Sequence, residues 1–410
     1  QISFTGEFAQ LIAGEAGGTQ DNASYIDDFE GTKTTIDVMT PTSWFISSVP
    51  SLNFKDDYSD KTGLSSGFHR SRLAWYTIDP LFTRRGSSLT PGHIKGDLKQ
   101  LSNHYVREVY TKELFPLRYQ SSYQGATNTL NVLNLAYYPS EPGPYNVTDL
   151  QADGTLQNPQ RNWGGMMRKL DTNDFEQANI EYIEFWMLDP FIYSREEADA
   201  ADYGGDFYIN LGEVSEDILR DGKKCYERGM PGDGSKSYTY TQWGKIPTQS
   251  TVTYAFATTS GSRALQDVGF NGLTDAEEQE FYSAYLDQIQ GKVNQAVFDS
   301  IFADPARDDY HYFRGSDWDE MRAPILQRYK YINNPQGNSP DSDSRSESYD
   351  TSYKSTPDVE DINQDYTLNE YEKYFQYRVS IRPEDLVVGN NHIVDKREYS
   401  QTWRDNTKST

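Results

Sequence analysis

Apolar and aromatic residues occur in short runs along this chain, and Gly, Pro, Asn, Asp and Ser separate the runs. Turn residues repeated at intervals of roughly 8–20 residues are typical of antiparallel strands. Within several runs apolar and polar residues alternate, which places every second side chain on the same face of a sheet. The predicted strands are Tyr25–Glu30, Arg72–Ile78, Asn131–Tyr138, Ile180–Leu188, Asp206–Ile209, Thr251–Ala257 and Tyr374–Ile381.

Two segments have the spacing of an amphipathic helix instead. In Ile94–Leu114 apolar residues recur at three- to five-residue intervals, and in Ala276–Phe302 every fourth residue is apolar from Phe281 to Val297. Neither segment is apolar on all sides, so we expect both helices to pack on a sheet.

Together these patterns predict a mainly β fold: a jelly-roll-like antiparallel β-sandwich with helical insertions at about residues 92–116 and 273–304. This elaborated domain is expected to span residues 25–390, between an N-terminal segment 1–24 and a C-terminal segment 391–410 that leads into a longer chain. Residues 333–357 are rich in Ser, Asn, Asp and Pro and are predicted to form a mobile loop.

The charge of the chain restricts its partners. Among 410 residues, 62 are acidic and 38 basic, which gives a formal net charge of −24 at pH 7. This charge argues against nucleic acid, since binding a phosphate backbone needs clustered Lys and Arg, and it favours a divalent cation. The longest apolar runs are too short for a transmembrane helix or a secretory signal, and the single Cys225 cannot form a disulfide within the chain.

Residues 361–372 have the pattern of a calcium-binding loop. Oxygen-bearing side chains occupy positions 1, 3, 5, 7, 9 and 12, which are the positions that ligate Ca²⁺ in such loops. Position 6 is normally Gly because the loop turns sharply there, and here it is Tyr366. The alternative is an acidic, solvated loop. The predicted Ca²⁺ ligands are Asp361, Asn363, Asp365, Thr367, Asn369 and Glu372.

A second stretch of the same length, residues 267–278, also resembles a calcium-binding loop but departs from the pattern at a different position. It carries Gly272 at position 6, but Gly269 leaves position 3 without a ligand. The alternative interpretation is that Thr274 or Asp275 caps the helix that follows. The predicted Ca²⁺ ligands of this weaker loop are Asp267, Asn271, Asp275 and Glu278.

The sequence gives no sign of catalysis. It contains no Gly-x-Ser-x-Gly elbow, no phosphate-binding loop with its Lys and no histidine spacing typical of zinc. Carboxylate pairs such as Asp27/Asp28, Glu196/Glu197 and Asp317/Asp319 could in principle serve a glycoside hydrolase, but in a chain so rich in acids any such pair is unspecific. We therefore predict no enzyme activity and no cofactor other than Ca²⁺.

Several longer motifs resemble the SprA (also called Sov) family of Bacteroidetes. They are Tyr25-Ile-Asp-Asp-Phe-Glu-Gly31, Asn179-Ile-Glu-Tyr-Ile-Glu-Phe-Trp-Met-Leu-Asp-Pro190, Tyr208-Ile-Asn-Leu-Gly-Glu-Val-Ser-Glu-Asp217, Gln266-Asp-Val-Gly-Phe-Asn-Gly-Leu273, Asp358-Val-Glu-Asp-Ile-Asn363 and Arg382-Pro-Glu-Asp-Leu-Val-Val-Gly389.

Members of that family are very large outer-membrane β-barrels that form the translocon of the type IX secretion system and support gliding motility. The resemblance implies a soluble, non-catalytic part attached to the barrel, on the extracellular or periplasmic side. It implies partners among the other secretion-system proteins and the secreted cargo. The 31 tyrosines suit such contacts, because Tyr contributes contact area while keeping a polar end in water.

A vaguer likeness to galactose-binding jelly rolls rests on Ile26–Glu30, the turn Trp163-Gly164-Gly165 and the predicted strand Ile180–Leu188. In those folds acidic residues of the first strand often lie near a structural Ca²⁺, which by resemblance adds Asp27, Asp28 and Glu30 as metal candidates. The alternative is that Asp27 and Asp28 are acidic residues at a strand edge. The alternative function implied by this likeness is a carbohydrate-binding module with a glycan as ligand. It would require two or three coplanar exposed Trp or Tyr side chains on one sheet face.

Overall fold

The computed structural model describes residues 36–83, 86–116, 128–178, 180–193, 204–226, 237–248, 269–335 and 358–399, together with the backbone of 401–402 and 408–409. The chain divides into two units, one of Gln1–Asp37 with Leu170–Met187 and one of Val38–Lys169 with Leu188–Thr410. The predicted strands Tyr25–Glu30 and Thr251–Ala257 lie outside the described residues, as do Asp27, Asp28 and Glu30 and residues 336–357 of the predicted mobile loop.

In the larger unit the described strands form two-stranded antiparallel sheets. In its described residues each strand pairs with one other, in the order β1–β6, β2–β5, β3–β4, β7–β10, β8–β9 and β11–β12. The strands are β1 (Phe45–Ile46), β2 (Ser71–Tyr76), β3 (Val109–Tyr110), β4 (Thr129–Leu130), β5 (Asn134–Pro142), β6 (Met166–Met167), β7 (Gly205–Glu213), β8 (Tyr238–Tyr240), β9 (Lys245–Pro247), β10 (Lys373–Ile381), β11 (Gln401–Thr402) and β12 (Lys408–Ser409).

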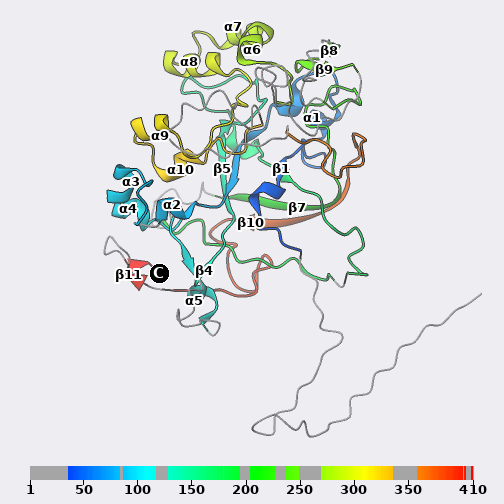
Figure 1. Cartoon of the computed structure of the whole chain (residues 1–410). Helices are drawn as coiled ribbons and strands as arrows, with labels where there is room; N and C mark the ends of the chain where they lie inside the picture. Colours follow the sequence, from blue (N-terminus) through cyan, green and yellow to red (C-terminus); the bar gives the residue numbers. More distant parts are fainter. Residues whose placement is uncertain are drawn as a thin grey trace, which may run out of the picture. The chain divides into compact units, whose positions relative to one another are not determined.

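The longest pair joins β7 and β10, which run side by side in Figure 1. Nine consecutive residue pairs, from Lys373↔Glu213 to Ile381↔Gly205, form this ribbon. Both strands were predicted from alternation in the sequence, as were β2 and β5, and their antiparallel pairing is confirmed. Two facing sheets, as a jelly roll requires, are not seen in the described part of the chain, since its strands remain in separate pairs.

The predicted strand Ile180–Leu188 is not a strand in the structure. Residues 180–188 have no regular secondary structure, and Tyr182 is 81% exposed. Alternation of side chains makes a strand possible, but only a hydrogen-bonded partner makes it stable.

The helices are short. They are α1 (Lys55–Ser59), α2 (Pro80–Thr83), α3 (Gly92–Gly96), α4 (Leu98–Leu101), α5 (Thr111–Leu114), α6 (Asp275–Phe281), α7 (Ser283–Ile289), α8 (Gln295–Ala303), α9 (Ser316–Glu320) and α10 (Ile325–Arg328), with 3₁₀ turns η1 (Pro41–Ser43), η2 (Ser65–Gly67) and η5 (Pro159–Arg161).

The single helix expected across 94–114 is divided into α3, α4 and α5. The Asp97 carboxylate accepts a hydrogen bond from the Gln100 N–H at 2.9 Å and starts α4, while the Asn103 side chain accepts from the Tyr105 N–H at 2.8 Å. Such bonds from short polar side chains compete with helix continuation, because they satisfy backbone groups locally. Helical structure at 92–116 is therefore present but interrupted.

The region 273–304 is helical as predicted, in the three pieces α6, α7 and α8. Tyr285, Ile289 and Val293 are buried, and Phe281 and Val297 pack against them at the edge of the same core. The four-residue apolar spacing thus does form one face. The helix breaks at Gly291, whose φ of 77° is left-handed.

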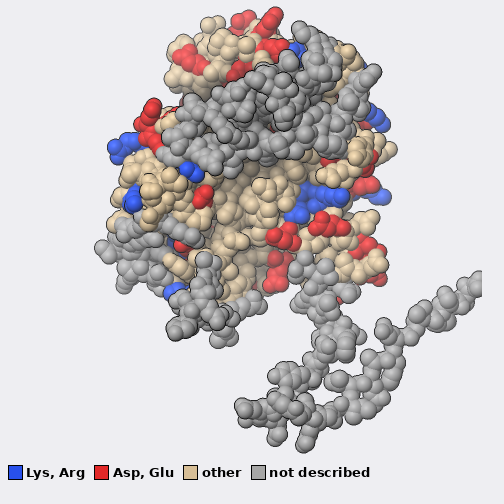
Figure 2. All heavy atoms as spheres, in the orientation of Figure 1, with Lys and Arg blue, Asp and Glu red and all other residues tan. Residues whose placement is uncertain are grey.

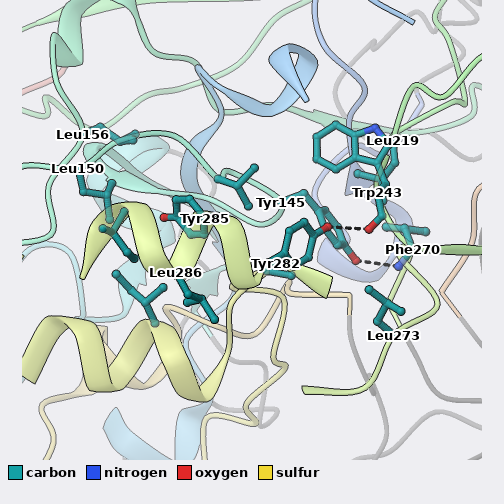
Figure 3. Close-up of a cluster of buried hydrophobic side chains, with 14 of the residues drawn as sticks. Tyr145, Leu150, Leu156, Leu219, Trp243, Phe270, Leu273, Tyr282, Tyr285 and Leu286 are labelled. Carbon is teal, nitrogen blue, oxygen red and sulfur yellow. Dashed lines mark hydrogen bonds between the residues drawn. The ribbon is translucent and has the colours of Figure 1, made fainter. Parts of the chain in front are cut away.

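Two buried clusters form the core of the larger unit. The first core cluster lies under α6–α8, and Figure 3 shows part of it. There the Tyr282 hydroxyl donates to the Trp243 carbonyl oxygen at 2.6 Å, and the Phe270 N–H donates to the Tyr145 hydroxyl at 2.7 Å. The second core cluster joins β2 to α2, α3, α4 and α10, with Tyr76 stacked on Tyr329 at 4.5 Å between ring centroids.

The face drawn in Figure 2 carries acidic and basic side chains scattered over its described area rather than one large basic patch. Among the helices that the structure describes, none has the length and apolar character that a membrane crossing requires.

Candidate metal centre

Residues 361–366 form a tight turn that closes on the Asp361 carboxylate. Asp361 is fully buried, and its two carboxylate oxygens accept hydrogen bonds from the N–H groups of Asp365 at 3.0 Å and Tyr366 at 3.3 Å. Tyr366 has a φ of 66°, in the left-handed region that the Gly at position 6 normally adopts. The residue that weakened the sequence pattern therefore adopts the turn that the pattern requires.

Asp365 gathers the other polar side chains of the loop. Its Oδ1 accepts from the N–H and the hydroxyl of Thr367, both at 2.8 Å, and its Oδ2 accepts from the amide groups of Asn363 at 3.1 Å and Asn369 at 3.4 Å. These bonds, above all the one from the Thr367 hydroxyl, lower the pKa of Asp365. Asp365 is exposed, so its carboxylate closes the loop on the solvent side.

The carboxylate that lies opposite comes from outside the loop. Glu216 is buried, and oxygen atoms of Glu216, Asp361 and Asp365 lie within 4.8 Å of one another. One Glu216 oxygen accepts from the N–H groups of Ile362 at 3.0 Å and Asn363 at 3.2 Å, and the other from the Asn369 N–H at 3.2 Å. The pKa of Glu216 is raised because the effect of burial exceeds the opposing effect of these three N–H donors. Glu216 therefore holds both ends of the loop.

Strand pairing explains how Glu216 reaches the loop. In the β7–β10 ribbon Glu213 is opposite Lys373, and in an antiparallel pair the residues that follow one strand meet those that precede the other. Glu216 follows β7 by three residues, and its N–H donates to the Asn369 carbonyl oxygen at 2.7 Å. The spacing of residues within the loop could not have indicated Glu216 as a ligand. Only the β7–β10 register places Glu216 beside the loop, and that register follows from the pairing of two strands that are distant in sequence.

Glu372, the predicted ligand at position 12, is not among the three carboxylates. Its oxygens accept from the Ser215 N–H at 2.8 Å and the Ser51 hydroxyl at 3.1 Å. The loop continues into strand β10 rather than into a helix, and extended chain advances about 3.3 Å per residue. The structure therefore brings together Asp361, Asn363, Asp365, Thr367 and Asn369 and places Glu372 against the segment that carries Glu216.

The donors present suit a hard cation. All side-chain ligands that the loop and Glu216 offer are oxygen atoms, which Ca²⁺ prefers at about 2.3–2.6 Å. The three carboxylate oxygens lie within 4.8 Å of one another, close enough together to hold one ion between them. A cation held by these oxygens would fix the loop to the end of β7.

The second predicted loop is arranged differently, and Asp267 lies outside the described residues. The Asn271 amide group donates to Glu278, while the Asn271 oxygen accepts from the Leu273 N–H at 3.0 Å. Asp275 is the first residue of α6, and the Thr274 N–H donates to the Glu277 carboxylate at 3.2 Å, in agreement with the helix-capping alternative. Glu278 lies instead beside Asp304 and Asp308.

Comparison with known proteins gives one family. The family model SprA_N, described as motility related/secretion protein, matches residues 284–410. This range contains the motifs Asp358–Asn363 and Arg382–Gly389 and the whole predicted calcium loop. The match confirms the resemblance to the SprA family. No curated protein matches the chain.

Proposed function

We propose that this chain, a member of the SprA family, is a non-catalytic part of an outer-membrane protein-export translocon. The family match supports a secretion- and motility-related protein that is associated with the cell envelope. In the proposed role the chain shapes the export channel and binds partner or cargo proteins. The SprA-like motifs between residues 25 and 389 support this role, because they extend the resemblance beyond the matched range.

One surface of the β7–β10 ribbon supports partner binding. Residues directly opposite in an antiparallel pair share a face, so every second residue of the two strands lies on the same side. On one side, between the charged pair Lys373 and Glu213 at one end and Ile381 at the other, the side chains are all apolar or aromatic: Phe207, Ile209, Leu211, Phe375, Tyr377 and Val379. We call this the apolar ribbon face. Phe375 on it is 77% exposed and Tyr377 51% exposed, and exposed apolar surface of this kind is typical of sites that bind another protein.

The apolar ribbon face suits a protein more than a glycan. Phe375 and Tyr377 lie on it two residues apart on one strand, beside aliphatic Ile209, Leu211 and Val379. Aliphatic side chains bury well against protein, whereas a sugar needs polar groups beside its aromatic platform. In the described residues neither edge of the ribbon pairs with a further strand, so a partner strand could also add to an edge.

The test uses Phe375→Glu with Tyr377→Glu in the full-length translocon. We expect export of cargo to fall about tenfold or more, because removing two central aromatic contacts costs on the order of 2 kcal/mol of binding. Secreted protein in the medium is measured, with the amount of translocon in the membrane as reference.

The matched control is Tyr182→Glu with Tyr240→Glu, which adds the same charge at exposed tyrosines that are not part of the apolar ribbon face and should leave export unchanged. Unchanged export in the Phe375/Tyr377 variant would overturn the partner-binding role. Tight binding of a glycan by the isolated chain would favour the carbohydrate-binding module instead.

We also propose that the loop 361–372 binds one Ca²⁺ through Asp361, Asn363, Asp365, Thr367 and Asn369, with Glu216 as a further ligand. Because a metal that binds only the folded state stabilises it by mass action, saturating Ca²⁺ should raise the melting temperature by several degrees relative to EDTA. Calorimetry of the wild type and Asp361→Ala tests this. A melting temperature that EDTA leaves unchanged, with Asp361→Ala behaving as wild type, would make 361–372 an acidic loop without metal.

A further inference from the structure

Three carboxylates meet in the interior beneath α6–α8. Glu278 comes from α6, and Asp304 and Asp308 come from the segment that follows α8. Oxygen atoms of the three lie within 4.8 Å of one another, and Glu278 and Asp308 are fully buried. Acidic side chains are seldom buried without a compensating partner, so each carboxylate must be accounted for.

Two of the three are held in place by N–H donors. The Glu278 oxygens accept from the Asn271 amide group and from the Ala306 N–H at 2.9 Å. The Asp304 oxygens accept from the N–H groups of Asp308 at 3.1 Å and Asp309 at 3.3 Å. Each carboxylate oxygen has a second lone pair, so these bonds fix the carboxylates while leaving acceptor capacity free.

Asp308 has no such donor. No N–H group among the described residues donates to either of its carboxylate oxygens. The neighbouring Arg307 is directed elsewhere, because its guanidinium donates to the Asn146 carbonyl oxygen and, at 2.6 Å, to the Tyr285 hydroxyl. The Tyr145 hydroxyl beside Asp308 accepts from the Phe270 N–H, as Figure 3 shows, and its own proton remains to be donated toward Asp308. A fully buried carboxylate that no N–H group stabilises, beside two other carboxylates, points to a missing cation.

Gly269 provides the space for this side chain. A Cβ atom at position 269 would overlap the Asp308 Oδ2 atom and the Tyr145 hydroxyl. Position 269 is also where the loop 267–278 has no ligand of its own. The missing side chain therefore leaves room for a carboxylate that arrives from a distant part of the sequence.

We propose that Glu278, Asp304 and Asp308 bind one buried Ca²⁺ that fastens α6 to the segment after α8. This site goes beyond the proposed export function and differs from the predicted loop set, with which it shares only Glu278. Three carboxylates and no nitrogen or sulfur donor select a hard cation over Zn²⁺. Ca²⁺ is favoured over Mg²⁺ because Mg²⁺ keeps several waters in a strict octahedron, for which a buried site has little room.

The test counts bound Ca²⁺ per chain by elemental analysis after dialysis against dilute Ca²⁺. Asp308→Asn, which keeps the shape and removes the charge, should hold one ion fewer than the wild type. Asp309→Asn changes the next residue, which contributes no oxygen to the cluster, and should hold as many ions as the wild type. Equal Ca²⁺ content in Asp308→Asn and wild type overturns the proposal.

Thermal melting gives a second readout, because only a carboxylate that binds metal should change how the melting temperature depends on Ca²⁺. In EDTA, Asp308→Asn should melt at or above the wild-type temperature, because it removes one buried like charge. In Ca²⁺ it should melt several degrees below the wild type, because it cannot gain the metal. If Asp308→Asn is the more stable protein in both buffers, a shared proton rather than Ca²⁺ holds the three carboxylates together and the proposal fails.

A Tb³⁺ titration of Asp361→Asn keeps the test decisive if Asp308→Asn does not fold. This variant removes a ligand of the loop 361–372, so the failure of either site can be told from the failure of the other. Tb³⁺ in the buried cluster should emit on tyrosine excitation, since Tyr145 lies beside Asp308, and Ca²⁺ should displace it. No sensitised emission from folded Asp361→Asn would overturn the buried site.

Discussion

The two acidic clusters of this chain contain the same chemical groups in opposite surroundings. In the loop cluster, Glu216, Asp361 and Asp365 all accept hydrogen bonds from nearby N–H groups, and Asp365 reaches solvent. In the buried cluster, Glu278 and Asp304 are held in the same way, but Asp308 is fully buried and accepts no hydrogen bond from an N–H group of the described residues.

This contrast separates two uses of a metal. A loop whose carboxylates already accept N–H groups keeps its shape without an ion, so Ca²⁺ would add stability to a conformation that exists before binding. Three carboxylates in the interior repel one another, and only a cation or a proton relieves that repulsion. The loop cluster is therefore expected to tolerate removal of metal, and the buried cluster to depend on it.

The largest expected effect comes from truncating one carboxylate in each cluster. Glu278→Ala leaves the Asn271 amide group and the Ala306 N–H without their acceptor, and buried donors left unpaired should cost about 2–4 kcal/mol in the free energy of unfolding. Asp365→Ala, whose lost donors are exposed to water, should cost much less. Urea denaturation in EDTA measures both, and equal losses would mean that burial does not distinguish the clusters.

The pH dependence of stability without metal should have opposite signs for Glu278 in the buried cluster and Asp365 in the loop cluster. Burial, reinforced by the neighbouring Asp304 and Asp275 carboxylates, raises the pKa of Glu278 to about 9. The unfolded chain then loses its proton at a lower pH than the folded protein, so stability is highest below about pH 4.5 and falls as pH rises toward 9, by up to about 1.4 kcal/mol per pH unit.

The lowered pKa of Asp365 acts in the other direction, since its contribution is present above the unfolded pKa and is lost as pH falls. Urea midpoints in EDTA at pH 5.5, 7 and 8.5 measure the slope. Glu278→Gln should flatten it, while Asp365→Asn should not. A wild-type midpoint independent of pH would show that Glu278 is not protonated in the folded protein.

A smaller effect is expected on the Ca²⁺ affinity of the loop cluster, where Glu216 and Glu372 are the two candidate ligands. Glu216→Gln should weaken Ca²⁺ binding to the loop about 10- to 100-fold, because the side chain that closes the site loses its charge. Glu372→Gln should change the affinity by less than about threefold, because Glu372 is bound to Ser215 and Ser51 instead. Isothermal titration of Ca²⁺ in the Asp308→Asn background measures the loop site alone. A larger loss of affinity in Glu372→Gln than in Glu216→Gln would show that Glu372, at position 12, is the ligand.

The smallest effect concerns the turn at position 6. Tyr366→Gly should stabilise the loop by no more than about 1 kcal/mol, because relief of the left-handed backbone is partly offset by the greater freedom of Gly in the unfolded chain. Gln364→Gly, at a φ of 61°, is the matched control at a position that contributes no ligand. A loss of Ca²⁺ affinity in Tyr366→Gly alone would show that the Tyr366 side chain, and not only its backbone, supports the site.

The sequence by itself determined the features that depend on a few neighbouring residues. Alternation indicated β2, β5, β7 and β10, and four-residue spacing indicated the helical region 273–304 and its buried face. The order of oxygen-bearing residues in 361–369 indicated a loop that closes through bonds between residues two to five positions apart. The motifs also indicated the SprA family, to which residues 284–410 were then matched.

The tertiary structure decided what depends on pairing across the chain. Residues 180–188 have no regular secondary structure, and the described strands remain in separate pairs. The β7–β10 register places Glu216 next to Asp361. It also brought Asp304 and Asp308 to Glu278 around Gly269, where residues 267–278 have no ligand of their own. Local spacing could not predict these contacts, because each one is formed by burial and strand pairing between segments that are distant in sequence.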